Sequence, residues 1–239
     1  MMYPSDFPLN FLRSINMSIF AFNLRNDVSK IWILVSNRIS RPSIVSNTEQ
    51  EITLEFAIQT NDFCVTFVYA SVLPNTRRGL WDQLRHLSSS QKPWMIMGDF
   101  NAVLGAHEKM GGNLPNTRSC EDFALMIEDC NLEVLNTTGS QFTWARKSGS
   151  RYVACRLDRA LCSNSWIDYW CSVNCSTLPR CNSDHNPIMV VCEDFTHRGP
   201  VPFRFKKMWC LNENFKNMVS DCWNSCSTYG GKLRAVVIN

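Results

Sequence analysis

No stretch of this 239-residue sequence is apolar over the ~18–20 residues that a membrane-spanning helix needs, so we expect no membrane span. The N-terminal segment also lacks the basic stretch that opens a signal peptide, and Asn10, Arg13 and Asn16 interrupt its apolar residues. We therefore expect residues 1–30 to be an atypical lead-in and the protein to be nuclear or cytoplasmic, not secreted.

Cysteine motifs are sparse as well. The twelve cysteines are scattered and fall below the ~8–10% that marks a disulfide scaffold. No CxxC occurs, and the CxxxC pairs Cys171/Cys175 and Cys222/Cys226 have no histidine nearby, which disfavours a zinc site. We expect reduced thiols, several of them buried.

Neither charge sign dominates the chain. The net charge is +3 and the sequence pI is about 8.3, a mild basic bias that suits a polyanionic partner but is weaker than that of a dedicated nucleic-acid binder. A hydrophobic fraction of 45% is enough for one domain with its own core, followed by a tail.

Apolar periodicity predicts a mixed α/β layered fold, because strands and helices alternate without the regular period of a doubly wound sheet. Segment 63–70 is apolar on both faces except at Thr66, which is typical of a central strand. Ser119 and Asp122 form a variant capping box, so a helix is expected to begin near Ser119. A first helix is predicted at 76–87, and strands at 31–36, 52–58, 63–70, 94–97, 141–144, 153–161 and 187–192.

The sequence changes character after about residue 195. Residues 197–202 read as a linker, 203–209 are basic and aromatic, and 212–226 could form an amphipathic helix. We expect residues 196–239 to be a linker and a helical tail that packs on the domain or on a neighbour.

The first motif with chemical potential is Gly98-Asp99-Phe100-Asn101, directly after a predicted strand. Asp99 and Asn101 are two residues apart, so on extended backbone both side chains could point into one cleft. A carboxylate beside an amide suits the binding of a nucleophilic water and a phosphate oxygen. Turns are also rich in Gly, Asp and Asn for conformational reasons, so for this motif alone a plain turn is the favoured interpretation.

Two more motifs combine acidic residues with strand ends. Asp158 lies in an apolar strand pattern, where a carboxylate is costly unless it has a partner, although it could also face solvent and pair with Arg156 or Arg159. Asp184 and His185 precede the last strand and place a hard oxygen ligand beside an imidazole that can act as acid, base or phosphate donor. A polar turn closed by Pro187 is the alternative interpretation.

Together these motifs resemble a known family. GDFNA (98–102), FTW (142–144), RLD (156–158) and SDHNP (183–187), with Tyr69 ending a buried strand upstream, resemble the endonuclease/exonuclease/phosphatase (DNase I-like) superfamily. Within it, the sequence is most similar to the endonuclease domain that precedes reverse transcriptase in plant non-LTR (LINE-type) retrotransposons. The resemblance covers roughly residues 30–226 and implies a four-layer sandwich of two packed mixed β-sheets flanked by helices, within an α/β (α+β) class.

The resemblance also implies roles for individual residues in the hydrolysis of a phosphodiester of DNA or RNA. Tyr69 would hydrogen-bond the scissile phosphate, Asp99 would position or deprotonate the attacking water, and Asn101 would orient that water. Asp158 would align His185, which would contact the phosphate. A divalent cation, Mg²⁺ or Mn²⁺, would be held at Asp184, because oxygen ligands without thiolates suit hard ions.

The sequence departs from the family pattern at its beginning. The family starts with a strand that carries an Asn and a second strand that ends in a metal-binding Glu, and residues 1–30 contain neither motif. Glu49 and Glu51 align with a later strand. We therefore expect a partial domain over 31–195, without its first strands and without the reverse transcriptase portion, monomeric and with impaired hydrolysis. A non-enzymatic nucleic-acid-binding relic, and a phosphatase or lipid phosphodiesterase of the same superfamily, stay open as alternatives.

Overall fold

A computed structural model describes residues 9–23, 29–58, 61–149, 151–194 and four residues between 214 and 220. The chain divides into two units, Met1–His197 and Arg198–Asn239. In the second unit only Asn214, Phe215, Asn217 and Ser220 are described, so the predicted linker and most of the predicted helix at 212–226 lie outside the described residues. The rest of the account concerns the first unit.

A six-stranded mixed sheet forms the centre of this unit, with the strand order β3-β4-β5-β6-β12-β8. Strands β5 and β6 run parallel, and their neighbours in the sheet are antiparallel. The central position of β5 confirms the prediction from its two apolar faces. The strands are β3 (Ser43–Asn47), β4 (Glu51–Ile58), β5 (Asn61–Tyr69), β6 (Trp94–Asp99), β8 (Leu132–Val134) and β12 (Asp158–Ser163).

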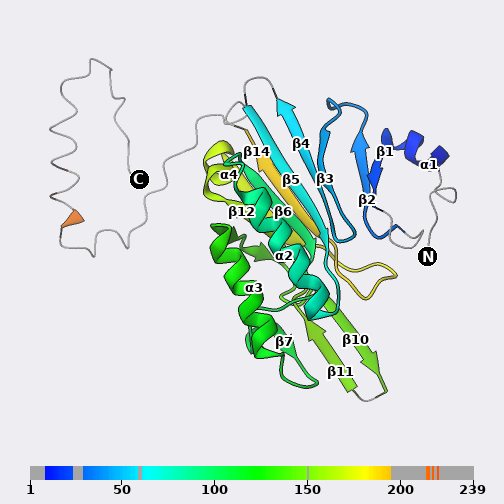
Figure 1. Cartoon of the computed structure of the whole chain (residues 1–239), viewed down its shortest axis with the longest axis vertical. Helices are drawn as coiled ribbons and strands as arrows, with labels where there is room; N and C mark the ends of the chain where they lie inside the picture. Colours follow the sequence, from blue (N-terminus) through cyan, green and yellow to red (C-terminus); the bar gives the residue numbers. More distant parts are fainter. Residues whose placement is uncertain are drawn as a thin grey trace, which may run out of the picture. The chain divides into compact units, whose positions relative to one another are not determined.

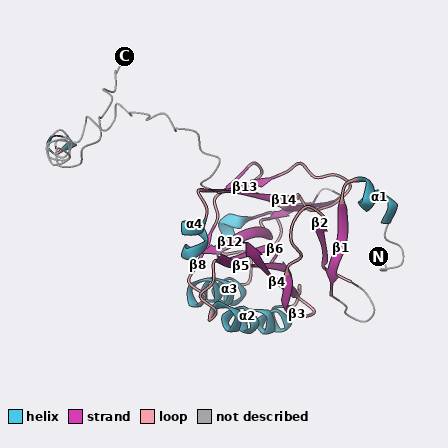
Figure 2. Cartoon of the chain, turned by 90° about the horizontal axis from the view of Figure 1, so that it is seen from above, coloured by secondary structure: helices cyan, strands magenta, loops and turns pink. Residues whose placement is uncertain are grey.

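Two helices, α2 (Pro74–Ser88) and α3 (Thr117–Asp129), cover one face of this sheet (Figures 1 and 2). Their apolar stripes, which include Leu84 and Phe123, are fully buried in one core cluster with sheet residues such as Ile96 and Leu161. Burial of this kind stabilises by roughly 25 cal/mol for each Å² of apolar surface, so the helices are held mainly by packing.

Two smaller sheets lie on the opposite face. One pairs β1 (Met17–Phe22) with β2 (Trp32–Ser36), and the other has the order β14-β13-β9, with β13 and β14 on the far side of the six-stranded sheet from α2 and α3 in Figure 2. Phe56 and Phe67 pack against the core clusters of both small sheets, which places both sheets on one face. The second sheet contains β9 (Thr137–Thr138), β13 (Ser172–Thr177) and β14 (Ile188–Glu193).

A third small sheet has the order β10-β11-β7 and projects beyond the end of β6 (Figure 1). It positions the FTW segment, because β10 begins at Trp144 and pairs in register with the end of β11. The remaining elements are α1 (Leu9–Ser14), η2 (Ala106–Glu108), β7 (Lys109–Met110), β10 (Trp144–Ser148), β11 (Arg151–Cys155) and α4 (Asn164–Tyr169).

The structure corrects two details of the sequence analysis. The single strand predicted at 153–161 is interrupted, because the backbone N–H groups of Arg156 and Leu157 are bound by Glu108 and Thr143 instead of a neighbouring strand. Helix α3 begins at Thr117, and its N-cap is Asn116, whose side chain accepts from the Ser119 N–H at 3.0 Å.

The segment expected to be a lead-in takes part in the fold where it is described. Residues 17–22 form β1, and Asn23 is buried, with its amide donating to the carbonyls of Thr48 and Glu49. The predicted mixed α/β class with packed mixed sheets is confirmed. Six of the nine described cysteines are buried free thiols, as expected. Among the described helices, none has the length and apolarity needed to cross a bilayer.

Candidate active site

Three of the predicted site residues form a row across three adjacent strands. Tyr69 ends β5, Asp99 ends β6 and Asp158 begins β12, and the register places Tyr69 opposite Asp99 and Asp99 opposite Asp158. Met97 and Ala160, two residues away on β6 and β12, are partners in the same register. Because side chains alternate along a strand, the row faces the same side of the sheet as Met97, the side that carries the small sheets.

The Gly98–Asn101 turn is held in place by Phe100, which packs into the core on the helix side of the sheet. Phe100 is fully buried and stacks among Trp81 and Phe123 of the two helices, so the next residue on each side points away from that core. Gly98 lies at φ +139°, and a Cβ there would collide with the carbonyl oxygen of Val68 on the neighbouring strand. Glycine is therefore required for the close approach of β5 and β6 that aligns Asp99 with Tyr69.

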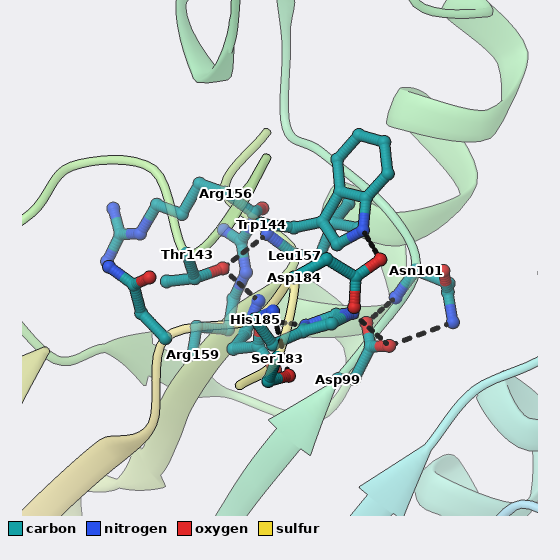
Figure 3. Close-up of polar contacts among 12 residues, drawn as sticks. Asp99, Asn101, Thr143, Trp144, Arg156, Leu157, Arg159, Ser183, Asp184 and His185 are labelled. Carbon is teal, nitrogen blue, oxygen red and sulfur yellow. Dashed lines mark hydrogen bonds and ion pairs between the residues drawn. The ribbon is translucent and has the colours of Figure 1, made fainter. Parts of the chain in front are cut away.

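Asn101 orients Asp99. Its backbone N–H donates to Asp99 Oδ1 at 2.8 Å, and its side-chain Nδ2 donates to Asp99 Oδ2 at 3.1 Å and to the Ala70 carbonyl at 2.9 Å (Figure 3). The residue has φ +45°, a conformation that Asn adopts more readily than most residues. The amide nitrogen thus holds Asp99, whereas none of the described residues forms a hydrogen bond with the amide oxygen, which is left for a ligand.

The carboxyl of Asp99 is electrostatically unusual. Burial, and then repulsion by the neighbouring Asp158 carboxylate, raise its pKa to about 6, although the Asn101 N–H, His185 and Arg77 favour the charged form. Only 8% of Asp99 is exposed. A carboxylate that titrates near pH 6 is a better proton acceptor at neutral pH than one with an ordinary pKa.

His185 comes from the loop before β14 and contacts both carboxylates. Its Nδ1 lies 2.9 Å from Asp158 Oδ2, and its Nε2 lies 3.9 Å from Asp99 Oδ2. The hydrogen bond to Asp158 raises the pKa of His185, with further contributions from the charges of Asp158, Asp99 and Asp184 outweighing partial burial. A proton on Nδ1 is held by Asp158, which leaves Nε2 directed toward Asp99.

The FTW segment holds the His185 loop against β12. Thr143 Oγ1 accepts from the N–H groups of Leu157 and Asp158 at 3.0 and 2.9 Å, and the Thr143 carbonyl accepts from Asn186 N–H at 2.6 Å. Trp144 Nε1 donates to Asp184 Oδ2 at 2.9 Å, and this bond lowers the pKa of Asp184 (Figure 3). The segment therefore sets the positions of Asp158, Asp184 and His185 together.

A buried arginine supports the turn from the helix side. Arg77 of α2 is 3% exposed, and its Nη1 donates to the carbonyls of Asn101 at 2.7 Å and Ser71 at 2.9 Å, while its Nη2 donates to Ser119 Oγ. Burial lowers the pKa of Arg77, partly offset by the charge of Asp99. This arginine ties the two chain segments that leave β5 and β6 to the start of α3.

A second buried arginine, Arg159, supports the start of β12. It forms a bidentate pair with Glu108, at 3.0 and 2.8 Å, and its Nη2 also donates to the carbonyls of Ala102 and Arg156. Although burial raises it, the pKa of Glu108 lies below its ordinary value because of the hydrogen bonds and charge of Arg159. The pair joins the segment after Asn101 to the residue next to Asp158.

Among the described residues, Asp99, Asp158 and His185 form a group in which one ligand atom of each lies within 4.8 Å of the others. Two neighbouring carboxylates favour a cation, because positive charge would relieve the repulsion that raises the Asp99 pKa. Oxygen donors without thiolates fit Mg²⁺ or Mn²⁺. Asp184, the expected metal residue, is not in this group, and its carboxylate is held by Trp144.

Sequence reasoning did not single out Arg77, Glu108, Thr143 or Trp144 as parts of the site. The FTW motif was noted, but no role was assigned to its members. Nothing in the sequence marks Arg77 or Glu108 among the 24 basic and 21 acidic residues, because burial of a charge depends on tertiary contacts. The sequence did offer one signal for Thr143 and Trp144, because both side chains of this adjacent pair can form hydrogen bonds.

Comparisons with known proteins agree with this geometry. Residues 63–189 match the model of a family described as endonuclease-reverse transcriptase, and this segment contains Tyr69, Asp99, Asn101, Asp158 and His185. No sequence among the curated proteins matches the chain.

Several solved structures are similar in fold at low sequence identity. The endonuclease domain of TRAS1, a telomere-specific non-LTR retrotransposon, is 16% identical with a TM-score of 0.59, over 77% of this chain and 82% of that domain. A 3′-5′ exonuclease from Neisseria meningitidis is 15% identical with a TM-score of 0.58, over 80% and 86%. An AP endonuclease from Archaeoglobus fulgidus is 13% identical with a TM-score of 0.58, over 80% and 85%.

Proposed function

The chain belongs to the endonuclease-reverse transcriptase family of the DNase I-like superfamily, and on that premise we propose that it hydrolyses phosphodiester bonds of nucleic acid with the help of a divalent cation. The observation that carries the proposal is the row of Tyr69, Asp99 and Asp158 on adjacent strands, with His185 hydrogen-bonded to Asp158. Solved structures with this fold include an endonuclease domain, an exonuclease and an AP endonuclease, which supports nucleic acid as the substrate.

Asp99 is the proposed general base. It is buried, it is held by two hydrogen bonds from Asn101, and its pKa of about 6 leaves it mostly ionised but still basic at neutral pH. It would accept a proton from the water that attacks phosphorus, and the Asn101 amide oxygen would orient that water.

His185 and Asp158 are proposed to stabilise the negative charge that develops on the phosphate. Asp158 fixes the imidazole through Nδ1 and favours its protonated form, so that Nε2 can donate to a phosphate oxygen as negative charge develops on it. Tyr69, which is 39% exposed at the end of the row, can offer its phenol to the same phosphate.

The carboxylates of Asp99 and Asp158 are the residues proposed to hold Mg²⁺ or Mn²⁺, with Asp184 at the edge of the site. When bound, the cation supplies positive charge to the phosphate and to the leaving oxygen. With His185 protonated, the described group offers only its two carboxylates to a cation that takes six ligands, so we expect millimolar metal to be needed and turnover to be slow.

Nicking of supercoiled plasmid tests this proposal. The wild-type chain should produce nicked circles in millimolar Mg²⁺ or Mn²⁺ and should stop on addition of EDTA. Asp99→Asn should slow the reaction about 100-fold or more, because it removes the general base. Asp82→Asn is the matched control, since the Asp82 side chain is 75% exposed on α2 and pairs with Arg85.

No nicking by a chain whose circular dichroism shows that it is folded, even at high Mn²⁺, would rule the proposal out. Hydrolysis of inositol phosphates or sphingomyelin in place of plasmid would replace nucleic acid by another phosphate ester as the substrate.

A further inference from the structure

A cavity of about 180 Å³ opens beside the catalytic row and is used by none of the steps above. It is lined by Lys30, Glu49, Gln50 and the segment 69–72. Ligand pockets for free small molecules typically measure ~300–1,000 Å³, so this cavity is too small for such a molecule and suits one unit of a longer ligand.

The cavity is joined directly to the proposed catalytic residues. Ala70, in its wall, donates its N–H to the carbonyl of Asp99 at 2.8 Å and accepts from Asn101 Nδ2 at 2.9 Å. Tyr69, the first member of the row, is also part of the wall. A group bound in the cavity would therefore lie next to a phosphate bound at Asp99.

Gln50 holds this wall in place. Its carbonyl accepts from the Tyr69 N–H at 3.0 Å, its Oε1 accepts from the Ser71 N–H at 2.7 Å, and its Nε2 donates to the Thr76 carbonyl at 3.1 Å. These three contacts hold the segment 69–71 of the wall in place before any ligand binds. Such preorganisation lowers the entropy lost on binding.

The side chains in the wall define the chemistry of the occupant. Lys30 is exposed, and its Nζ lies 5.9 Å from the centre of the Tyr69 ring. An ammonium next to an exposed aromatic ring can bind a phosphate and the adjoining sugar or base together. Glu49 is the single acidic residue in the lining, and its charge disfavours a second phosphate in the same space.

We propose that this cavity binds the sugar-phosphate unit of the nucleotide that flanks the scissile bond, with its phosphate at Lys30 and its sugar against Tyr69. The proposal rests on the proposed function for the identity of the ligand as nucleic acid. It makes Lys30 a substrate-binding residue, and it requires at least one nucleotide on the Tyr69 side of the bond that is cut.

Equilibrium binding tests the proposal independently of turnover. A fluorescein-labelled DNA duplex is titrated with the full chain in EDTA, and anisotropy is read at several salt concentrations. Lys30→Ala should weaken binding about 5- to 10-fold at low salt and should reduce the slope of log K against log salt by about one, as expected for the loss of one phosphate contact. Lys30→Arg should retain most of the affinity.

Lys92→Ala is the matched control. Lys92 precedes β6 at the end of the strand opposite to Asp99, and its ammonium pairs with Glu55 and Asp62. This variant should bind like wild type. Tyr69→Ala should weaken binding more than Tyr69→Phe, because the second variant loses the phenol but retains contact with the ring.

The outcomes separate this site from the proposed function. Lys30-dependent binding without plasmid nicking would support the nucleotide site and overturn only the catalytic proposal. Nicking with equal affinities and salt slopes for Lys30→Ala and Lys92→Ala would overturn the nucleotide site alone. A folded wild-type chain that neither binds the duplex nor nicks plasmid would overturn both proposals.

Discussion

Nδ1 of His185 and Oδ2 of Asp158 lie 2.9 Å apart, although the two residues are 27 positions apart in the sequence and His185 lies in a loop. Asp158 begins β12 in the six-stranded sheet, whereas His185 precedes β14 in a sheet that covers it. The Thr143 hydroxyl and carbonyl connect both segments, so the contact follows from how the two sheets are held together.

Asp158→Asn should lower the pKa of His185. The substitution removes the largest cause of its elevation, the hydrogen bond and charge of Asp158, while partial burial still disfavours the imidazolium. The chain has only four histidines, so the shift can be followed by NMR titration of the imidazole signals. Activity should fall about 100-fold in the same variant. An unchanged His185 titration would show that the two side chains are not paired in solution.

The pH dependence of nicking should be bell-shaped. Asp99 must be ionised to bind the cation and to accept a proton, so the rate should rise with pH; the pKa of Asp99 is about 6 without metal and bound positive charge lowers it, so this rise should move to lower pH as the metal concentration increases. His185 must carry its proton to donate to the phosphate, and because its pKa is raised, the rate should fall only above the ordinary range of histidine. Initial rates measured from pH 4.5 to 9 at constant ionic strength check this. A rising limb that stays at the same pH at all metal concentrations and in Asp99→Asn would show that Asp99 is not the group that titrates.

Gly98→Ala and Gly79→Ala should have opposite effects on stability. At Gly98 a Cβ would strike the Val68 carbonyl at φ +139°, so we expect a loss of a few kcal/mol and displacement of Asp99. At Gly79 in α2 nothing lies within 4 Å of the added Cβ, and alanine should stabilise the helix by roughly 0.5–1 kcal/mol. Urea unfolding of both variants measures the difference. Equal stabilities would argue against the described approach of β5 and β6.

Glu108→Ala should be among the most destabilising single substitutions. It leaves the Arg159 guanidinium buried without its carboxylate, and loss of one partner of a buried pair costs about 3–5 kcal/mol. Asp129→Ala is the control, because it breaks the half-exposed pair with Arg85 and should cost less than about 1 kcal/mol. The double variant Glu108→Leu/Arg159→Met should recover part of the loss in urea unfolding. A Glu108→Ala variant as stable as Asp129→Ala would contradict this account.

The strands and the acidic residues of the site could be predicted from the sequence because both have strong local signals. Alternating or continuous apolar residues predicted β4, β5, β6 and β14, and the Gly98–Asn101 motif follows directly after one of these predicted strands. The two helices were also predicted, although the N-cap of α3 was misplaced by three residues. Asn116 is the cap because its side chain accepts from the Ser119 N–H. Asn and Ser are both common N-cap residues, so the sequence alone does not decide between Asn116 and Ser119.

The supporting residues could not be predicted, because their roles depend on contacts between distant segments. Arg77 binds Asn101 across 24 residues, and Arg159 binds Glu108 across 51. Strand β1 was missed since its residues are mostly half-buried and follow no clear alternation. The expected absence of the first family strands and of a catalytic Glu, and with it the impairment of hydrolysis, stays a prediction, as do the role of Asp184 and the domain boundaries.

The small sheets on one face of the molecule also affect how the chain behaves at high concentration. Within the described part of the chain, β14 pairs with β13 alone, and Met189 and Val191 are 44% and 41% exposed. At the border of the six-stranded sheet, β3 exposes Ile44 and Val45. Unpaired strand edges with apolar side chains are templates for strands of other molecules, and a net charge of +3 provides little mutual repulsion. We therefore expect self-association at high concentration to begin at these strand edges.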